Sequence, residues 1–519
     1  MQLQPGHAAA EGAAPSLHAA ADQTAASIPP ANGPLCVDLD GTLVKSDTLL
    51  DTVIVLARQS PRSLLEFPLW IGEGKAAFKR KVSTVAAIDV VHLPYNKPLL
   101  EYLRQQHSAG REIYLATGAD TLLAERVAAH LGIFTGVLAS DGNVNLTGHN
   151  KLAAFKERFP QGFCYIGNAR PDLPLLMDCL DPMVANPHRG LLRGLRSAGV
   201  RPVETFTDAA SPVKAWLRAI RLHQWAKNTL IFLPVLLAHV RAMGPIVAAL
   251  LAFLSFGLAA SATYILNDLL DLEADRHHPR KRHRPFASGD ISPIAGVATI
   301  LVFLASSLAI AFLLPRALSA LSPQFPWNGQ GGFLEWLVIY AVSTTAYSLR
   351  LKRMVLVDVI VLSGLYTIRI LAGSAAAGVM VSPWLAAFSI FFFLSLAFVK
   401  RFAELESMRI RSEVAGTNAV KGRGYRVSDL EQIRSFGTAS GCASVVIFAL
   451  YIGNEVAIGL YPHHTRLWLL VPVLLLWLFR LWLQASRGEL HEDPVVYAIT
   501  DKRSLLLGVV VVAIVLSAL

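Results

Sequence analysis

Apolar and polar residues follow two different patterns along the 519-residue chain. Between about 34 and 205, short apolar runs end in loop-forming residues, and amphipathic stretches such as 120–132 separate them. This alternation of strands and helices predicts a Rossmann-like parallel sheet with helices on both faces. Residues 45–108 show a helical pattern with no strand signal, which predicts a helical insert. Residues 1–33 are rich in Ala, Pro, Ser and Gly without an apolar period, and we expect a disordered leader there.

Beyond about residue 213 the apolar runs become much longer. A transmembrane helix needs roughly 20 predominantly apolar residues. Stretches near this length fall at 229–243, 245–267, 291–314, 333–349, 355–379, 382–399, 436–460, 465–485 and 504–519. We therefore predict a multidomain protein: an α/β domain over 34–205, a linker over 206–228, and an all-α membrane domain of nine transmembrane helices over 229–519.

The positive charges in the connecting segments predict the orientation. With the α/β domain inside, the inside segments carry 23 Lys and Arg residues and the outside connections carry three: Arg241, Arg316 and Arg466. Cytoplasmic loops are enriched in Lys and Arg. The sequence thus predicts an integral cell-membrane protein with its N-terminal domain and polar motifs in the cytoplasm and its C-terminus outside.

Composition supports a lipid-embedded chain. Hydrophobic residues make up 53% and charged residues 16%, and the mean hydropathy is +0.46; an ordinary soluble chain is roughly 25% charged. Four scattered cysteines without a CxxC exclude a disulfide framework and a cysteine zinc site. The net charge of +10 is explained by the cytoplasmic loops, and no nucleic-acid-binding motif accompanies it. The oligomeric state is not determined by the sequence.

A cluster of carboxylates ends the second predicted span. Asn267 is followed by Asp268, Asp271 and Asp275, whose i, i+3, i+7 spacing places them on one face of a helix. Converging carboxylates favour Mg²⁺, which takes oxygen ligands and completes its shell with substrate phosphates. The basic stretch that follows, which includes Arg282, suits phosphate oxygens. An acidic helix end beside a solvated basic loop is the simpler alternative.

A second polar cluster follows the fourth predicted span. Tyr347 and Lys352 lie in YSLRLKR, Asp358 comes shortly after, and Arg369 lies within an apolar helix. An ionised residue inside a span is expensive and is a functional candidate by default. The alternative for Arg369 is an ion pair that only locks helix packing.

The segment NDLLDLEADRHHPRKRHRP resembles the NDxxDxxxD signature of the UbiA prenyltransferase superfamily, and YSLRLKR with Asp358 resembles its second motif. The strings RLHQWAKNTLIFLP, KRFAEL and HEDPVVYAITD look like the branch that resembles decaprenyl-phosphate phosphoribosyltransferases. Many relatives carry a DxxxD second motif, whereas here Leu362 stands four residues after Asp358. That departure weakens a second carboxylate metal site.

The resemblance implies transfer of phosphoribose from phosphoribosyl pyrophosphate (PRPP) to a polyprenyl phosphate, whose chain length the sequence leaves open. It implies that Asp268, Asp271 and Asp275 hold Mg²⁺ and pyrophosphate, with Asn267 orienting them. The side chains that would neutralise phosphates are Lys227, Arg282 and Lys352. One alternative is an aromatic prenyltransferase that uses a polyprenyl diphosphate. Another, from a different class, is a polytopic transporter or lipid-binding protein with a regulatory soluble domain.

The N-terminal region carries a second set of motifs. Asp38-Leu39-Asp40-Gly41-Thr42 resembles motif I, DxDGT, of the haloacid dehalogenase (HAD) superfamily. That resemblance implies a phosphatase in which Asp38 is the nucleophile, Asp40 the general acid and base, and Thr117 a phosphate ligand. Lys151 would offset carboxylate charge, and Asp172 would help Asp38 to hold Mg²⁺. Asn168 departs from the aspartate of many members, so a weak domain kept for structure or regulation is the alternative. A working phosphatase would remove the 5-phosphate of the lipid-linked product.

Overall fold

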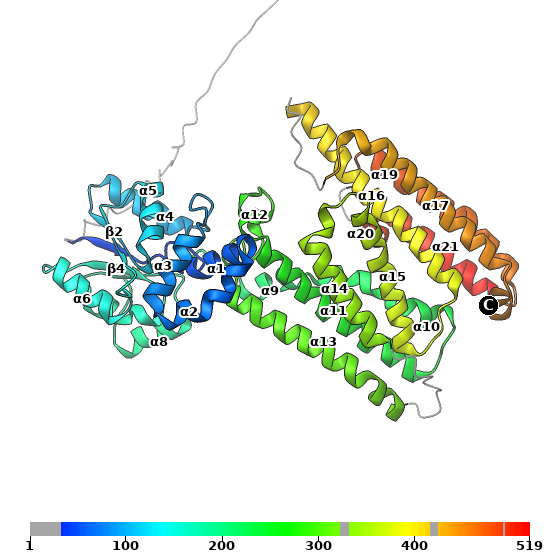
Figure 1. Ribbon diagram of the computed structural model, residues 1–519, viewed down its shortest axis with the longest axis horizontal. Helices are drawn as coiled ribbons and strands as arrows, with labels where there is room; N and C mark the ends of the chain where they lie inside the picture. The colour runs from blue at the N-terminus through cyan, green and yellow to red at the C-terminus, as the bar shows by residue number, and fades with distance from the viewer. Residues whose placement is uncertain (1–32, 322–331, 416–423, 491–493) are drawn as a thin grey trace, which may run out of the picture.

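The computed structural model describes residues 33–321, 332–415, 424–490 and 494–519. The predicted leader lies outside the described residues, apart from residue 33. The described chain forms an N-terminal α/β part and a helical part, which Figure 1 shows side by side.

The N-terminal part is built on a six-stranded parallel sheet of order β3-β2-β1-β4-β5-β6. The strands are β1 (Leu35–Val37), β2 (Ile113–Asp120), β3 (Gly136–Ser140), β4 (Cys164–Gly167), β5 (Pro182–Ala185) and β6 (Glu204–Phe206). The predicted parallel sheet is therefore confirmed. The strand order reverses between β1 and β4, and ligands of open α/β sheets bind at the carboxyl ends of strands at such a point.

Helices cover both faces of this sheet because its strands are apolar on both sides. Leu35 and Val37 of β1 pack with α1, α3, α4 and α5, whereas Cys36 between them packs with α6, α7 and α8. The helices are α1 (Thr48–Gln59), η1 (Pro61–Glu66), α2 (Phe67–Gly72), α3 (Lys75–Val85), α4 (Lys97–Ser108), α5 (Thr121–Leu131), α6 (His149–Arg158), η2 (Arg170–Asp172), α7 (Leu173–Asp178) and α8 (Arg189–Ser197). The first five of these form the predicted helical insert.

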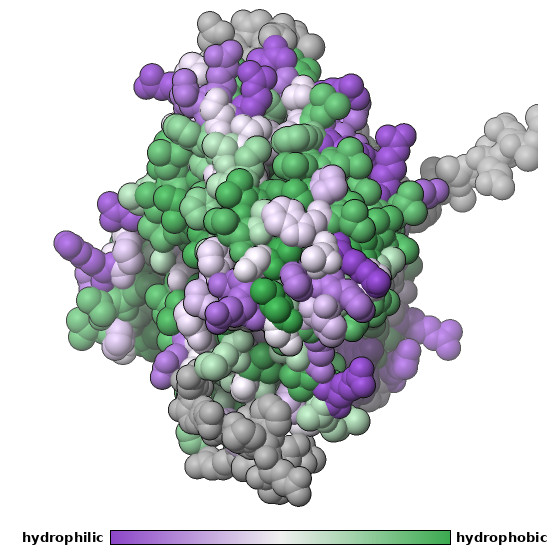
Figure 2. All heavy atoms as spheres, turned by 90° about the vertical axis from the view of Figure 1, so that its right-hand side faces the viewer, coloured by the Kyte–Doolittle hydropathy of each residue, from purple (hydrophilic) through white to green (hydrophobic). Residues whose placement is uncertain are grey.

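The second part is helical throughout its regular structure. Its elements are α9 (Pro212–Ile220), η3 (Leu222–Phe232), α10 (Leu233–Leu237), α11 (Met243–Leu270), α12 (Leu272–His277), η4 (Lys281–His283), α13 (Pro293–Leu321), α14 (Phe333–Leu349), η5 (Leu351–Arg353), α15 (Val357–Ala377), α16 (Pro383–Ala415), η6 (Val427–Asp429), α17 (Leu430–Ile452), α18 (Glu455–Leu460), η7 (His464–Leu469), α19 (Leu470–Ser486), α20 (Pro494–Thr500) and α21 (Lys502–Ala518). Figure 2 shows a broad apolar surface over this part, with hydrophilic side chains above it and also at its sides and over the lower half of the face shown.

Six helices among the described residues are long and apolar enough to cross a membrane. The prediction of nine spans is not confirmed. The helices α14 and α21 have 17 residues each, or about 26 Å, slightly less than a hydrocarbon core of roughly 30 Å. The first predicted span, 229–243, falls in the end of η3 and the five-residue α10. An apolar run measured along the sequence therefore overestimates the number of long helices here.

The two parts meet where α1 packs on α11, α12 and α13, and Figure 1 shows α1 beside α12. Several ion pairs cross this interface, among them Lys45 with Asp290 at 2.8 Å and Arg276 with Asp51 at 2.8 Å. The Arg58 guanidinium also donates a hydrogen bond to the carbonyl of Leu270. The α/β part thus lies against the end of α11, where the predicted aspartate cluster begins.

Candidate active sites

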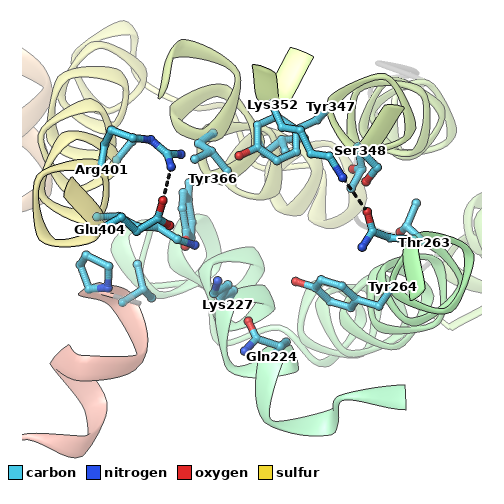
Figure 3. A pocket seen from close by; sticks show the side chains of 18 of the residues that line it. Gln224, Lys227, Thr263, Tyr264, Tyr347, Ser348, Lys352, Tyr366, Arg401 and Glu404 are labelled. Atoms are coloured by element: carbon cyan, nitrogen blue, oxygen red, sulfur yellow. Dashed lines mark hydrogen bonds and ion pairs between the residues drawn. The ribbon is translucent and has the colours of Figure 1, made fainter. Parts of the chain in front are cut away.

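A polar cavity of about 830 Å³ lies among η3, α11, α14, α15 and α16. Figure 3 shows Lys352 and Tyr264 on one side of it and Arg401 with Glu404 on the other. Six residues predicted as substrate or metal ligands line the cavity: Asn267, Asp271, Lys227, Tyr347, Lys352 and Arg369. Four others do not: Asp268, Asp275, Arg282 and Asp358.

Asp271 is the member of the aspartate cluster that lines the cavity. The sequence predicts one continuous helix through the cluster, but α11 ends at Leu270 and α12 begins at Leu272, with Asp271 between them. This break turns the Asp271 carboxylate toward Lys352, whose ammonium lies 3.2 Å from it and 3.4 Å from the Asn267 amide oxygen. Arg58 of the α/β part lies 3.5 Å from the same carboxylate.

The other two carboxylates lie directly behind the cavity wall. Asp268 and Asp275 are each 2% exposed. The Arg284 guanidinium bridges them, at 3.0 Å and 2.7 Å, and Arg221 lies 2.5 Å from Asp268. Arg284 and Arg221 also line the cavity. Asp268 and Asp275 therefore share one arginine, whereas Asp271 is paired separately with Lys352, and the convergence of all three carboxylates on one ion stays a prediction.

This end of the cavity has the donor set of a divalent-cation site. Three carboxylates and an amide oxygen are the ligands that Mg²⁺ prefers. Each carboxylate here is neutralised by an arginine or a lysine, because unpaired buried charge is strongly destabilising. The residues present therefore fit the expected metal.

Further basic side chains, on η3 and α15, line the cavity. Arg369 is 5% exposed, donates to the Asn228 amide oxygen at 2.9 Å and to the Tyr340 hydroxyl at 3.1 Å, and lies over the Tyr340 ring. Its described partners are neutral, so the alternative of a simple locking ion pair is not what these contacts show. Lys227 lies over the Tyr366 ring nearby. Among the described lining residues, nine are Lys or Arg and two, Asp271 and Glu404, are acidic.

Two predicted ligands have other surroundings. Asp358 is fully buried, accepts a hydrogen bond from the Tyr425 hydroxyl and forms an ion pair with Arg401 at 2.7 Å. Its described contacts are therefore within the protein, and Arg401 reaches the cavity in its place. Arg282 is exposed, and Arg284, two residues on, lines the cavity instead. Residues two apart point to different sides of a turn. The basic composition of this segment alone does not show which arginine faces the cavity.

A second polar cluster lies at the carboxyl end of β1 and β4. The Lys151 ammonium donates to Asp38 at 2.8 Å and to the Tyr165 hydroxyl at 3.0 Å, and that hydroxyl donates to Asp172 at 2.8 Å. The other oxygen of Asp172 accepts from two backbone N–H groups, those of Asn168 and Ala169. The sequence motifs did not identify Tyr165 as part of this cluster. Its position on β4, three residues before Asn168, is the signal that could have identified it.

The two motif I aspartates are held differently. Asp40 accepts hydrogen bonds from the backbone and hydroxyl of Thr48, at 2.8 and 2.7 Å. Burial raises the pKa of Asp40 to about 7 and that of Asp38 to about 6, and Lys151 opposes the rise at Asp38. A carboxyl with a pKa near 7 can both give and take a proton at neutral pH. Thr117 on β2 is fully buried and accepts from the Ala119 N–H.

Asn168 lies against the motif I turn. Gly41 adopts φ +75°, and a Cβ on it would lie 2.0 Å from the Asn168 amide nitrogen. Asn168 therefore packs on the turn that places Asp40, and its amide oxygen is a neutral candidate ligand beside Asp38 and Asp172. The oxygen set of this cluster fits Mg²⁺, with one carboxylate fewer than the DxDGT resemblance leads one to expect.

Comparison with known proteins identifies the membrane part. Residues 229–506 match the UbiA prenyltransferase family, and the chain belongs to this family of membrane transferases. The uncharacterized protein y4nM of Sinorhizobium fredii is 39% identical over 92% of this chain and 89% of its own length. The decaprenyl-phosphate phosphoribosyltransferase of Mycobacterium tuberculosis is 31% identical over 49% of this chain and 81% of its own length.

Among solved structures, a UbiA homolog from Archaeoglobus fulgidus bound to GPP and Mg²⁺ aligns with 59% of this chain and 99% of its own. The TM-score is 0.42 and the sequence identity is 16%. The family and the six apolar helices together indicate an integral membrane protein.

Proposed function

We propose that the membrane domain transfers a 5-phosphoribosyl group from PRPP to a polyprenyl phosphate and releases pyrophosphate. The bond between ribose C1 and the pyrophosphate oxygen breaks, with the electron pair leaving on pyrophosphate. A new bond forms between C1 and an oxygen of the lipid phosphate. That oxygen is already anionic, so the reaction needs no strong base. The similarity to decaprenyl-phosphate phosphoribosyltransferase supports this branch of the family.

The observation that carries the proposal is the presence of basic side chains from several elements around one cavity. Arg284 and Lys352 are paired with the aspartates, and Lys227 on η3 and Arg369 on α15 line the same cavity. A phosphoribosyl transfer brings two phosphorylated substrates together, whereas an aromatic acceptor carries no phosphate. A cavity lined by nine Lys and Arg residues suits two phosphorylated substrates, because arginine and lysine bind phosphate oxygens strongly.

The aspartate end is the proposed site for Mg²⁺ and pyrophosphate. Asp268, Asp271 and Asp275 would hold the ion, which when bound supplies positive charge to the leaving pyrophosphate. Arg284 and Lys352, which now neutralise these carboxylates, would then contact phosphate oxygens. Asn267 lies beside Asp271 and would orient it. Exclusion of water from the cavity when the substrates bind would keep these charge interactions strong.

Radiolabel transfer tests this proposal directly. Membranes containing the chain receive Mg²⁺, polyprenyl phosphate and PRPP labelled in the ribose, and the lipid phase is extracted. We expect labelled lipid, reduced by about 100-fold or more in Asp271→Asn and unchanged in the exposed control Glu431→Gln. Absence of label, together with prenylation of an aromatic acceptor from polyprenyl diphosphate, would replace the proposal with the aromatic prenyltransferase. Neither product would favour the transporter or lipid-binding alternative.

We further propose that the α/β domain is a HAD-type phosphatase that removes the 5-phosphate from this product. Asp38 would attack phosphorus and form an aspartyl phosphate while Asp40 donates a proton to the leaving sugar oxygen. Water would then hydrolyse the intermediate, with Asp40 taking up the proton. The contacts among Lys151, Asp38 and Asp172 support this assignment. Asp38, Asp172 and the Asn168 amide would hold Mg²⁺, which would offset phosphate charge.

The charge of the labelled lipid tests the second step. We expect Asp38→Asn to transfer ribose normally but to accumulate lipid that still carries the 5-phosphate. The exposed variant Glu157→Gln should behave as wild type. A domain that hydrolyses simple phosphates but never this lipid would contradict the proposed substrate, and one inactive on all phosphates would support the structural or regulatory alternative.

A further inference from the structure

Three potential metal ligands meet at the interface between the two parts. Asp89 and His92 lie between α3 and α4 of the α/β part, and His277 ends α12 of the membrane part. One carboxylate oxygen of Asp89 lies 2.6 Å from Nδ1 of His92 and 2.8 Å from Nε2 of His277. The two imidazole rings are 4.2 Å apart between centroids. The ligand atoms of the three residues lie within 4.8 Å of one another.

The hydrogen bonds of His277 determine which of its nitrogens can bind a metal. Its Nδ1 lies 2.8 Å from the backbone carbonyl of Glu273. Because a carbonyl only accepts, Nδ1 carries a proton and donates it. A neutral His277 then has its lone pair on Nε2, the nitrogen that faces the Asp89 carboxylate. Two lone pairs do not approach to 2.8 Å without a positive charge between them, so a second proton or a metal ion belongs there.

The surroundings match those of a bound metal. Ligating histidines usually donate their other N–H to a backbone carbonyl or a carboxylate, which fixes the ring and its tautomer, as Glu273 does for His277. The second oxygen of Asp89 accepts from the Val91 N–H, which orients the carboxylate. A cavity of about 10 Å³ adjoins the cluster, and Glu273 and Arg276 also line it.

We propose that Asp89, His92 and His277 form a site for a borderline divalent ion of the Zn²⁺ class. Two imidazoles and a carboxylate are typical ligands for Zn²⁺, with bonds of roughly 2.0–2.2 Å. Tetrahedral coordination would separate the ligand atoms by roughly 3.3 Å. The present nitrogen–oxygen distances of 2.6 and 2.8 Å are within a small side-chain movement of that value.

The position of the site gives it a structural consequence. His277 lies on α12, two residues after Asp275, whereas Asp89 and His92 belong to the helical insert of the α/β part. A metal held by all three would join the two parts at the segment that carries the aspartate cluster. This inference does not depend on the proposed transferase or phosphatase activity.

Metal binding by the full chain tests the site. Tag-free protein in detergent is stripped with a chelator, and millimolar Mg²⁺ is added to occupy the aspartate clusters. Zn²⁺ is then titrated in competition with a chromophoric chelator. We expect one tight site, weakened by about 100-fold or more in His92→Ala and in His277→Ala, since even loss of a supporting contact costs 10- to 100-fold. The exposed His107 on α4 supplies the matched control, His107→Ala.

A second measurement separates ligation from a folding defect. Zinc X-ray absorption of wild type should show two imidazole ligands. His92 and His277 lie on different parts and are 42% and 45% exposed, so a shared loss of binding is not explained by unfolding of one part. Equal Zn²⁺ affinity in wild type and both histidine variants, or an absorption spectrum without imidazole, would overturn the proposal. The cluster would then be a carboxylate–imidazolium ion pair held by protons.

Discussion

The ion pair between Arg276 and Asp51 should hold the two parts of the molecule together. Arg276 on α12 is 7% exposed and Asp51 on α1 is 1% exposed. The guanidinium lies 2.8 Å from the carboxylate and also reaches the Ser46 hydroxyl and the Ala287 carbonyl. Arg276→Met removes the cation but keeps most of the aliphatic volume, so the carboxylate stays buried beside a single hydroxyl donor.

The magnitude can be bounded in two ways. Removing one member of a buried ion pair costs about 3–5 kcal/mol because the remaining charge is uncompensated. The variant can escape by protonating Asp51, and protonating an ordinary aspartate at pH 7 costs about 4 kcal/mol. We therefore expect a loss of about 3–4 kcal/mol, which corresponds to a 100- to 1,000-fold larger population of the opened interface.

Hydrogen exchange of peptides from α1 and α12 measures this opening. Exchange there should accelerate by about 100- to 1,000-fold in Arg276→Met, and Arg276→Met/Asp51→Asn should recover part of the protection. The exposed control Arg280→Met should match wild type. An acceleration below tenfold, or a double variant no better protected than the single one, would refute the reasoning.

Two further predictions concern the wall of the cavity and the α/β site. A Cβ on Gly373 of α15 would lie 2.1 Å from the Ile231 carbonyl oxygen. We therefore expect Gly373→Ala to displace η3 and to reduce phosphoribosyl transfer. The control is Gly364→Ala on the same helix, whose added Cβ meets nothing within 4 Å and should leave transfer unchanged. In chelator, the folded sheet should lose stability as pH rises from about 4 to about 7, because burial raises the pKa of Asp38 to about 6 and of Asp40 to about 7. Between the unfolded and the folded pKa of each group, the folded state holds a proton that the unfolded state releases, and each such proton changes the stability by about 1.4 kcal/mol per pH unit. Exchange rates of sheet peptides, corrected for intrinsic rates, should rise over this range and rise less in Asp40→Asn; constant protection would contradict the shifts.

The sequence by itself determined the parallel sheet, the helical insert and the membrane character of the second part. The alternation of strand and helix patterns and the length of apolar runs are local properties of the sequence, so they predict secondary-structure elements directly. The order of motifs also placed Asp38, Lys151 and Asp172 together, because parallel strands end at the same edge of a sheet. In the same way, the ends of apolar runs located Asn267, Asp271 and Lys352, which line one cavity.

Only the tertiary structure determined which contacts each of several similar side chains makes. Arg276, Arg282 and Arg284 look alike in one basic stretch, yet one is buried against Asp51, one is exposed and one bridges two aspartates. The pairing of Asp358 with Arg401 likewise joins two different helices, α15 and α16. Charge pairing and burial are long-range properties, so composition and spacing along one segment predict a polar site but not its individual contacts.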